Sequence, residues 1–306
     1  MKFEQINLQN FKIILQSTLF WVLTLFIRFT MAQTLADKAT QKNQSQIETF
    51  IVESTFLSRK VTVEIVLPPN YHETQQKYPV LFLNDGQDLQ RLHFLTTYNA
   101  FLTQNPSKTF VVVAVHTNEN RMQEYGVAST PDYKNRGARA GLYSRFVVNE
   151  LLPLVRCNYR LSTDANQNFI AGFSLGGLSA FDLAWHNAQV FGKVGVFSGS
   201  FWWRKKAYED GYDDHNDRIM QVIVRQNTQK PPIQIWLQTG TDDETDDRNQ
   251  NGIIDSIEDT LDLISELEKQ GFGWNKDLKY VEVPNGQHNP DTWGKIMPDF
   301  FGWLFK

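Results

Sequence analysis

The sequence predicts an α/β protein with a mostly parallel central sheet, antiparallel strands at its N-terminal edge and helices on both faces. Short apolar segments recur along the chain, and after about residue 140 they alternate with helix-like segments. This alternation is typical of strand–helix units that build a parallel sheet. The expected strands cover residues 48–55, 60–67, 79–84, 109–116, 167–171, 193–198, 232–238 and 278–283.

One late helix is also predicted, over residues 256–270. Its apolar residues Ile257, Leu261, Ile264 and Leu267 recur at the spacing of one helix face, and Gly271 suits the helix end.

The N-terminal residues 1–32 have the character of a secretory signal peptide. Lys2 and Lys12 precede an apolar stretch over residues 13–27, and Ala32 stands before the expected cleavage site. We therefore expect an exported protein, periplasmic or secreted, in which residues 33–47 form a flexible spacer and residues 48–306 form one domain. An uncleaved membrane anchor is the alternative, but the stretch is short for a span. After cleavage, no stable membrane insertion is expected.

Composition narrows the class of protein further. The 306 residues include 30 Lys and Arg and 34 Asp and Glu, which gives a formal net charge of −4. No basic stripe is visible, so a nucleic-acid partner is not expected. A single cysteine, Cys157, excludes an internal disulfide. The hydrophobic fraction of 41% is ordinary for one globular domain with a large core.

Residues 168–177 contain the most informative motif. An apolar run leads into Gly172-Phe-Ser174-Leu-Gly176 and then into a segment of small residues. A strand, a sharp turn and a helix in this order form a nucleophile elbow, which exposes the serine oxygen at the end of a sheet. Ser174 is therefore the predicted nucleophile.

A serine nucleophile needs a base, and the base needs an orienting acid. In serine hydrolases with this elbow, the acid and then the histidine follow the serine along the chain. His288 follows the last expected strand and a turn, so it is the predicted base. The acid should follow the preceding strand, where Asp242, Asp243 and Glu244 stand in a row. Asp243 is favoured and Asp242 is second.

Catalysis by such a serine also needs an oxyanion hole made of two backbone N–H groups. One should come from Leu175, directly after the nucleophile. The other should come from the loop after strand 79–84, where Gly86 and Gln87 are the candidates.

Together these motifs resemble the putative-esterase family of the α/β-hydrolases, which holds S-formylglutathione hydrolases, feruloyl and acetyl-xylan esterases, and siderophore esterases. The resemblance covers the chain from about residue 50 to its end. It rests on residues 83–87 (LNDGQ), 121–125 (RMQEY), 150–153 (ELLP), 171–177 (AGFSLGG), 197–203 (FSGSFWW), 286–289 (GQHN) and Trp293. It implies an α/β-hydrolase fold and carboxyl-ester hydrolysis without a catalytic cofactor. In the family the acid usually stands three residues after a strand-end glycine, which points to Asp243 after Gly240.

A second motif follows the acid. Residues 247–258 match the calcium loop D-x-[DN]-x-[DN]-G-x5-E at every specified position. Oxygen ligands at this spacing converge on a hard cation. No helix is expected to enter the loop, so we predict an EF-hand-like site for a structural Ca²⁺ rather than a full EF-hand. Its ligands would be Asp247, Asn249, Asn251, the Ile253 carbonyl, Asp255 and Glu258.

The predicted function is serine carboxylesterase activity on a small-molecule or oligosaccharide ester. An acylated carbohydrate and a siderophore-type ester are the favoured substrates, and Trp202 and Trp293 are candidate substrate contacts. Two alternatives remain open on the sequence. One is a peptidase or acyltransferase that uses the same triad, and the other is a non-catalytic binding protein stabilised by calcium.

Overall fold

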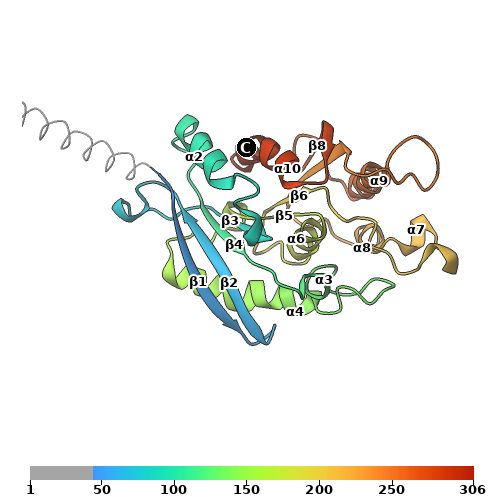
Figure 1. The fold of residues 1–306 in the computed structure, drawn as a ribbon, viewed down its shortest axis with the longest axis horizontal. Helices are drawn as coiled ribbons and strands as arrows, with labels where there is room; N and C mark the ends of the chain where they lie inside the picture. The colour runs from blue at the N-terminus through green and yellow to red at the C-terminus, as the bar shows by residue number, and fades with distance from the viewer. Residues whose placement is uncertain (1–43) are drawn as a thin grey trace, which may run out of the picture. The chain divides into compact units, whose positions relative to one another are not determined.

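The computed structural model describes residues 44–306, and within this range the chain forms the predicted α/β fold (Figure 1). The predicted signal peptide and the spacer up to residue 43 lie outside the described residues. The first strand begins at Gln46, two residues before the predicted start of the domain.

An eight-stranded sheet forms the centre of the domain. In space its strands follow the order β1-β2-β4-β3-β5-β6-β7-β8. β1 pairs antiparallel with β2, and β2 pairs antiparallel with β4, while every other neighbouring pair is parallel. The mostly parallel sheet with an antiparallel N-terminal edge is thus confirmed. The strands are β1 (Gln46–Ser54), β2 (Arg59–Leu67), β3 (Val80–Asn84), β4 (Val111–Val115), β5 (Asn168–Phe173), β6 (Lys193–Phe197), β7 (Gln234–Asp242) and β8 (Leu278–Gln287).

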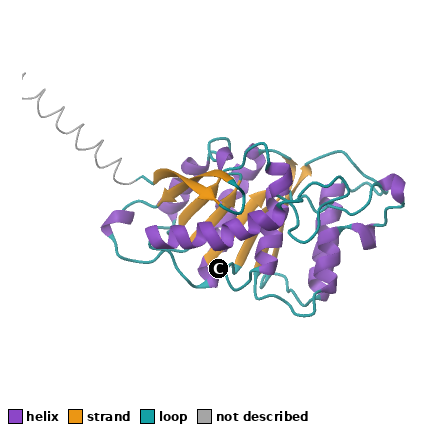
Figure 2. Ribbon diagram, turned by 90° about the horizontal axis from the view of Figure 1, so that it is seen from below, coloured by secondary structure: helices purple, strands orange, loops and turns teal. Residues whose placement is uncertain are grey.

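Helices cover both faces of the sheet (Figure 2). The α-helices are α2 (Phe94–Gln104), α3 (Arg121–Glu124), α4 (Ala140–Arg145), α5 (Leu152–Asn158), α6 (Leu175–His186), α7 (Asp214–Asp217), α8 (Ile219–Gln226), α9 (Asp255–Lys269) and α10 (Pro290–Leu304). Short 3-10 helices occur at η1 (Tyr71–Glu73), η2 (Gly86–Asp88), η4 (Ala165–Gln167) and η5 (Tyr208–Asp210), and a π-helical segment, η3 (Phe146–Leu151), joins α4 to α5. The predicted helix over 256–270 is α9.

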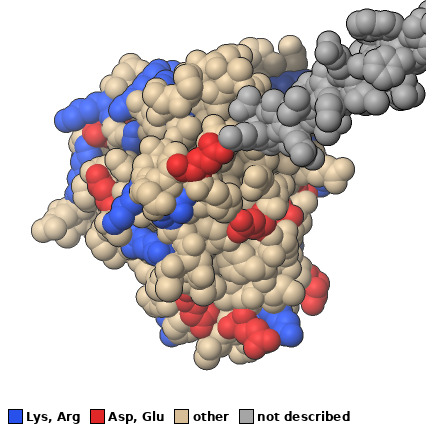
Figure 3. All heavy atoms as spheres, turned by 90° about the vertical axis from the view of Figure 1, so that its left-hand side faces the viewer, with Lys and Arg blue, Asp and Glu red and all other residues tan. Residues whose placement is uncertain are grey.

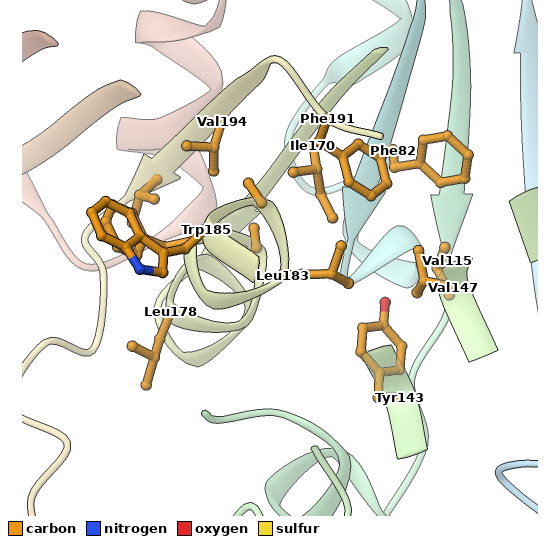
Figure 4. Packing of buried hydrophobic residues seen from close by; sticks show 14 of the residues in the cluster. Phe82, Val115, Tyr143, Val147, Ile170, Leu178, Leu183, Trp185, Phe191 and Val194 are labelled. Atoms are coloured by element: carbon orange, nitrogen blue, oxygen red, sulfur yellow. The ribbon is translucent and has the colours of Figure 1, made fainter. Parts of the chain in front are cut away.

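Two hydrophobic cores lie on opposite faces of the sheet because side chains alternate along each strand. On β3, Val80 and Phe82 enter one core, and Leu81 and Leu83 enter the other. Helices α4, α5, α6, α8 and α9 pack on the first core, part of which is drawn in Figure 4. Helices α2 and α10 pack on the second. Burial on both faces explains why the central strands are continuous apolar runs.

The surface of the domain carries charges of both signs. Lys and Arg side chains lie near Asp and Glu side chains on the face drawn in Figure 3. Within residues 44–306, none of the helices combines the length and the apolar character needed to cross a bilayer.

A buried ion pair ties the start of β2 to α3. The Arg59 guanidinium donates to both carboxylate oxygens of Glu124, with Nη2 2.6 Å from Oε2. The Glu124 side chain is fully buried and that of Arg59 is 12% exposed. Removal of the cation would leave a buried negative charge without a partner, which is costly.

We expect Arg59→Ala to lower the free energy of unfolding by about 3–5 kcal/mol, because the Glu124 charge stays buried and unpaired. The neighbouring Lys60 offers a matched control, since its pair with Glu53 is largely exposed. Lys60→Ala should change stability little. Urea denaturation of both variants measures the difference, and equal losses would contradict it.

Candidate active site

Ser174 lies on a strained turn between β5 and α6. Its backbone has φ 54° and ψ −123°, a conformation that non-glycine residues rarely adopt. A Cβ atom on Gly172 would lie 2.2 Å from the carbonyl oxygen of Gly176, so the turn closes only with glycine at this position. The predicted nucleophile elbow therefore has the expected backbone geometry.

The ends of neighbouring strands hold the Ser174 turn in place. The Ser174 backbone N–H donates to the carbonyl of Phe197, at the end of β6, at 2.8 Å. The side chain of Asn84, at the end of β3, donates to the Gly176 carbonyl at 2.8 Å. Ser174 Oγ lies 3.5 Å from the Oγ atom of buried Ser200. Ser174 itself is half-buried at the carboxyl edge of the sheet.

The two candidate acids differ in environment. Asp242 is the last residue of β7 and is exposed, whereas Asp243 is 8% exposed. Asp243 Oδ1 accepts a hydrogen bond from Ser198 Oγ at 3.0 Å, and its buried Oδ2 has no hydrogen-bond partner among the described residues. The structure therefore turns Asp243 inward and Asp242 toward solvent.

A close approach of two glycines brings the acid loop and the His288 loop together. A Cβ atom on Gly240 would lie 2.2 Å from the carbonyl oxygen of Gly286. His288 follows β8 on the second loop and remains exposed on one side, and its ring meets Trp293 edge-on at 5.2 Å between centroids.

Charge and burial shift the pKa values of Asp243 and His288 in opposite directions. Burial raises the pKa of Asp243, while hydrogen bonds from the backbone and Ser198 and the charge of His288 lower it in part. Burial of part of the ring lowers the pKa of His288; Asp243 raises it and Arg121 lowers it further. The net effect favours a neutral imidazole, which is the form that can accept a proton.

The loop after β3 faces the elbow. Asp85 has a left-handed backbone with φ 62°, and Gly86 and Gln87 follow in η2. Gln87 lines the same pocket as Ser174 and His288, and Leu175 is the first residue of α6. The residues predicted to supply the oxyanion hole therefore come from the two segments next to the serine.

An ion pair forms one wall of this region. Arg121 Nε and Nη2 each lie 2.7 Å from an oxygen of the buried Asp85 carboxylate. Thr117 and Gln87 also donate to that carboxylate. The Arg121 guanidinium lies over the Tyr125 ring, with Cζ 5.2 Å from the ring centroid. Such a bidentate pair holds both side chains in one geometry.

These residues surround a pocket of about 440 Å³. It is lined by Asp85, Gln87, Asp88, Arg91, Arg121, Phe173, Ser174, His288, Pro290 and Trp293. A larger cavity of about 810 Å³ has residues of α2, β7 and α10 in its lining, but its lining residues within 44–306 include no serine, cysteine or histidine. Chemistry rather than size therefore selects the smaller pocket as the candidate active site.

Comparison with protein-family models identifies the family of this chain. A family model described as Putative esterase matches residues 54–304. The chain belongs to this family. It is therefore a carboxylic ester hydrolase, and the alternative of a non-catalytic binding protein is set aside.

Two relatives match different shares of the chain. An uncharacterized protein, YbbA of Bacillus subtilis, is 28% identical over 79% of this chain and 91% of its own length. An iron(III) enterobactin esterase of Dickeya dadantii is 33% identical, but the match covers 31% of this chain and 22% of that protein.

Solved structures share the fold. A ferulic acid esterase has a TM-score of 0.64 at 16% identity and covers 85% of this chain and 98% of its own. The enterobactin esterase of Shigella flexneri with enterobactin has a TM-score of 0.67 at 20% identity, covering 85% of this chain and 58% of its own. These likenesses confirm the α/β-hydrolase fold.

The two tryptophans that were predicted to contact substrate occupy different places. Trp293 lies in the first turn of α10 and lines the pocket, although it is only 7% exposed. Trp202 is half-buried beneath the guanidinium of Arg136, 4.9 Å from the ring centroid, and does not line the pocket. Substrate contact by either ring stays a prediction.

The segment predicted to bind calcium, residues 247–258, covers the end of the loop between β7 and α9 and the first turn of α9. The amide groups of Asn249 and Asn251 both donate to Glu258 Oε1, at 2.6 and 2.7 Å, and Asp247 accepts the backbone N–H groups of Asn251 and Gly252. Asp255 instead pairs with Arg248 at 3.1 Å. In the part of the chain that the structure describes, no group of three or more His, Cys, Asp or Glu side chains is arranged to hold a metal.

Sequence reasoning did not assign roles to Arg121, Ser198 or Ser200. Each of them stands inside a segment that carried the family resemblance. The family resemblance could therefore indicate that these segments lie near the site, but it does not say which of their side chains point toward the serine.

We expect the acid limb of the pH profile of kcat/KM to lie below the pKa of an ordinary histidine, because the pKa of His288 is lowered. Arg121→Gln removes a charge that lowers this pKa, so the limb should move to higher pH. Arg121→Lys keeps the charge and should leave the limb in place. Hydrolysis of p-nitrophenyl acetate measured against pH tests this, and equal limbs in all three proteins would contradict it.

Proposed function

We propose that Ser174, Asp243 and His288 form the catalytic triad of this esterase. His288 would take the proton from Ser174 Oγ as the oxygen attacks the ester carbonyl carbon. It would then return the proton to the departing alcohol, which leaves an acyl-enzyme. Water, deprotonated by His288, would release the acid and restore the serine.

The observation that carries this proposal is the joint position of the three residues. Ser174 and His288 line one pocket, and Asp243 is the buried carboxylate whose charge acts on His288. The lowered pKa of His288 suits a base that must be neutral before it accepts a proton.

The oxyanion hole is proposed at the backbone N–H of Leu175 together with that of Gly86 or Gln87. The N-terminal end of α6 adds a partial positive charge at this point. The ester carbonyl oxygen, which becomes negative in the tetrahedral intermediate, would be stabilised there.

The substrate is proposed to be a polar ester, either an acylated carbohydrate or a siderophore-type ester. The pocket combines charged and amide side chains (Asp85, Gln87, Asp88, Arg91, Arg121) with the apolar rings of Phe173 and Trp293. Such walls suit a hydroxyl-rich group beside an aromatic or apolar one. Two of the structurally similar proteins are named as esterases of ferulic acid and of enterobactin, which supports a substrate of one of these two kinds.

We also propose that residues 247–258 bind a structural Ca²⁺. Asp247, Asn249, Asn251 and Glu258 already converge, and rotation of the two amide groups would present oxygens in place of nitrogens. The Asp255 carboxylate would have to leave Arg248 to become a ligand. The triad itself needs no cofactor for catalysis.

Export is proposed from residues 1–32, with cleavage near Gln33. The N-terminal sequence of the protein isolated from its native host tests this. An intact Met1 in the membrane fraction would instead indicate an uncleaved anchor.

Removal of the nucleophile should abolish ester hydrolysis. Ser174→Ala and His288→Ala should each lower kcat by at least about 10⁴-fold, and the double variant should be little worse, because triad residues act as a unit. Asp243→Asn should lose far more activity than its exposed neighbour's variant, Asp242→Asn. These losses are measured as kcat for p-nitrophenyl acetate and for a panel of other purified esters. Full activity in His288→Ala, or the reverse order for the two aspartates, would contradict the assignment.

Chelation should destabilise the protein if the loop holds Ca²⁺. A cation bound only to the folded state adds about 2.7 kcal/mol when its concentration is a hundredfold above Kd. We therefore expect a chelator to lower Tm and turnover, and calcium to restore both. Glu258→Gln should abolish this response, whereas Glu268→Gln, on the same helix outside the loop, should keep it. If calorimetry detects no calcium binding at millimolar concentration, the loop is only a solvated turn.

A further inference from the structure

A chain of hydrogen bonds joins the first turn of α10 to the carboxyl group of Asp243. Trp293 Nε1 donates to Ser198 Oγ at 2.9 Å, and Ser198 Oγ donates to Asp243 Oδ1 at 3.0 Å. The exposed fractions are 7% for Trp293, 2% for Ser198 and 8% for Asp243. Hydrogen bonds in such a dry environment are stronger electrostatically than those at the surface.

The direction of this chain follows from its donors. An indole nitrogen can only donate, so the Ser198 oxygen accepts from Trp293 and its own proton is directed to Asp243. An ionised carboxylate can only accept. Both hydrogen bonds therefore point toward the negative charge of the acid and stabilise it.

These hydrogen bonds also determine which oxygen of Asp243 remains available to accept a hydrogen bond from His288. Oδ1 is occupied by Ser198, whereas the buried Oδ2 has no hydrogen-bond partner among residues 44–306. A triad acid must offer one oxygen to the ring N–H of the base and hold it there. Oδ2 is the oxygen left for His288.

Trp293 touches the surroundings of all three triad residues. Its ring meets the His288 ring at 5.2 Å and 79°, and it stacks on Phe173 at 5.0 Å and 25°. Phe173 directly precedes Ser174, and the indole N–H reaches Asp243 through Ser198. One ring on α10 thus contacts the last residue of the nucleophile strand and the base directly, and reaches the acid through Ser198.

Ser198 itself is held by its backbone. It follows β6 with φ 47°, and its N–H donates to the Gln238 carbonyl of β7 at 2.7 Å. A non-glycine residue at positive φ stores strain that the surrounding structure must maintain. The hydroxyl is therefore presented to Asp243 from a fixed position between two strand ends.

We propose that Ser198 and Trp293 are positioning residues that hold the Asp243 carboxylate with Oδ2 turned to His288. This inference rests on the triad proposed above. Both residues act through the acid, and the ring of Trp293 also forms part of the pocket wall.

Two variants separate the hydrogen-bond chain from packing. Ser198→Ala removes the hydroxyl, and Trp293→Phe keeps an aromatic ring but removes the N–H donor. The rate at which a fluorophosphonate probe labels Ser174 needs no knowledge of the natural substrate. It is measured against pH in the purified protein, together with kcat and KM for p-nitrophenyl acetate.

For both variants we expect the labelling rate and kcat to fall roughly tenfold while KM stays unchanged, because a hydrogen bond to a charged group is lost or weakened. The acid limb of both rates should move to higher pH. A carboxylate that loses the Ser198 hydrogen bond holds a proton on His288 more strongly, which raises the pKa of His288 to which the limb belongs. The double variant should be no worse than Ser198→Ala, because Trp293 donates through Ser198.

Phe300→Leu is the matched control. Phe300 is buried and packs on Phe197, the residue before Ser198, at 5.2 Å between ring centroids. This variant should lower Tm but leave the acid limb where it is in the wild-type protein, because it removes packing and no hydrogen bond.

Three results would overturn the proposal. The first is an unchanged acid limb in both Trp293→Phe and Ser198→Ala, with Ser174 still labelled. The triad would then stand, and the hydrogen bonds from Trp293 and Ser198 would have only a packing role. A rise of KM alone in Trp293→Phe would show that this ring contacts substrate instead. Absence of labelling at Ser174 in the wild-type protein would overturn the triad itself and the inference with it.

Discussion

The parallel alignment of β3 and β5 to β8 is the constraint on which the candidate active site depends. Parallel neighbours end at the same edge of a sheet, so the loops that carry Gln87, Ser174, Ser198, Asp243 and His288 meet there. Both faces of the sheet are covered by helices and filled with apolar side chains. Polar groups that must meet a substrate are therefore confined to the strand ends, where backbone and side chains can reach solvent.

Two buried carboxylates at this edge have their negative charges stabilised in different ways. Asp85 receives a bidentate guanidinium from Arg121, which neutralises it and holds the loop after β3 beside the elbow. Within residues 44–306, no cation pairs with Asp243 in this way. The Ser198 hydroxyl donates to it, and the charge of His288 when protonated lowers its pKa. A firmly paired acid would be inert, whereas a hydrogen-bonded acid with one free oxygen can still stabilise a histidine that gains a proton.

Much of the fold could be predicted because its signals are local. Every predicted strand overlaps an observed one, and the elbow has the strained serine that its glycines and small residues indicate. The largest differences lie at the ends of β7 and β8, which extend to Asp242 and Gln287. There the chain is polar, so periodicity gives no signal, and pairing with the neighbouring strand prolongs the ladder.

The sequence by itself determined the sheet, the turn at Ser174, the position of His288 after the last strand and the spacing of residues 247–258, because each depends on residues close together in the chain. Only the tertiary structure turned Asp243 inward and Asp242 outward, paired Arg121 with Asp85, and joined Trp293 to Ser198. Those contacts link residues 36, 45 and 95 positions apart for Arg121–Asp85, Ser198–Asp243 and Trp293–Ser198. Long-range packing sets the direction of each side chain there, and no local pattern encodes it.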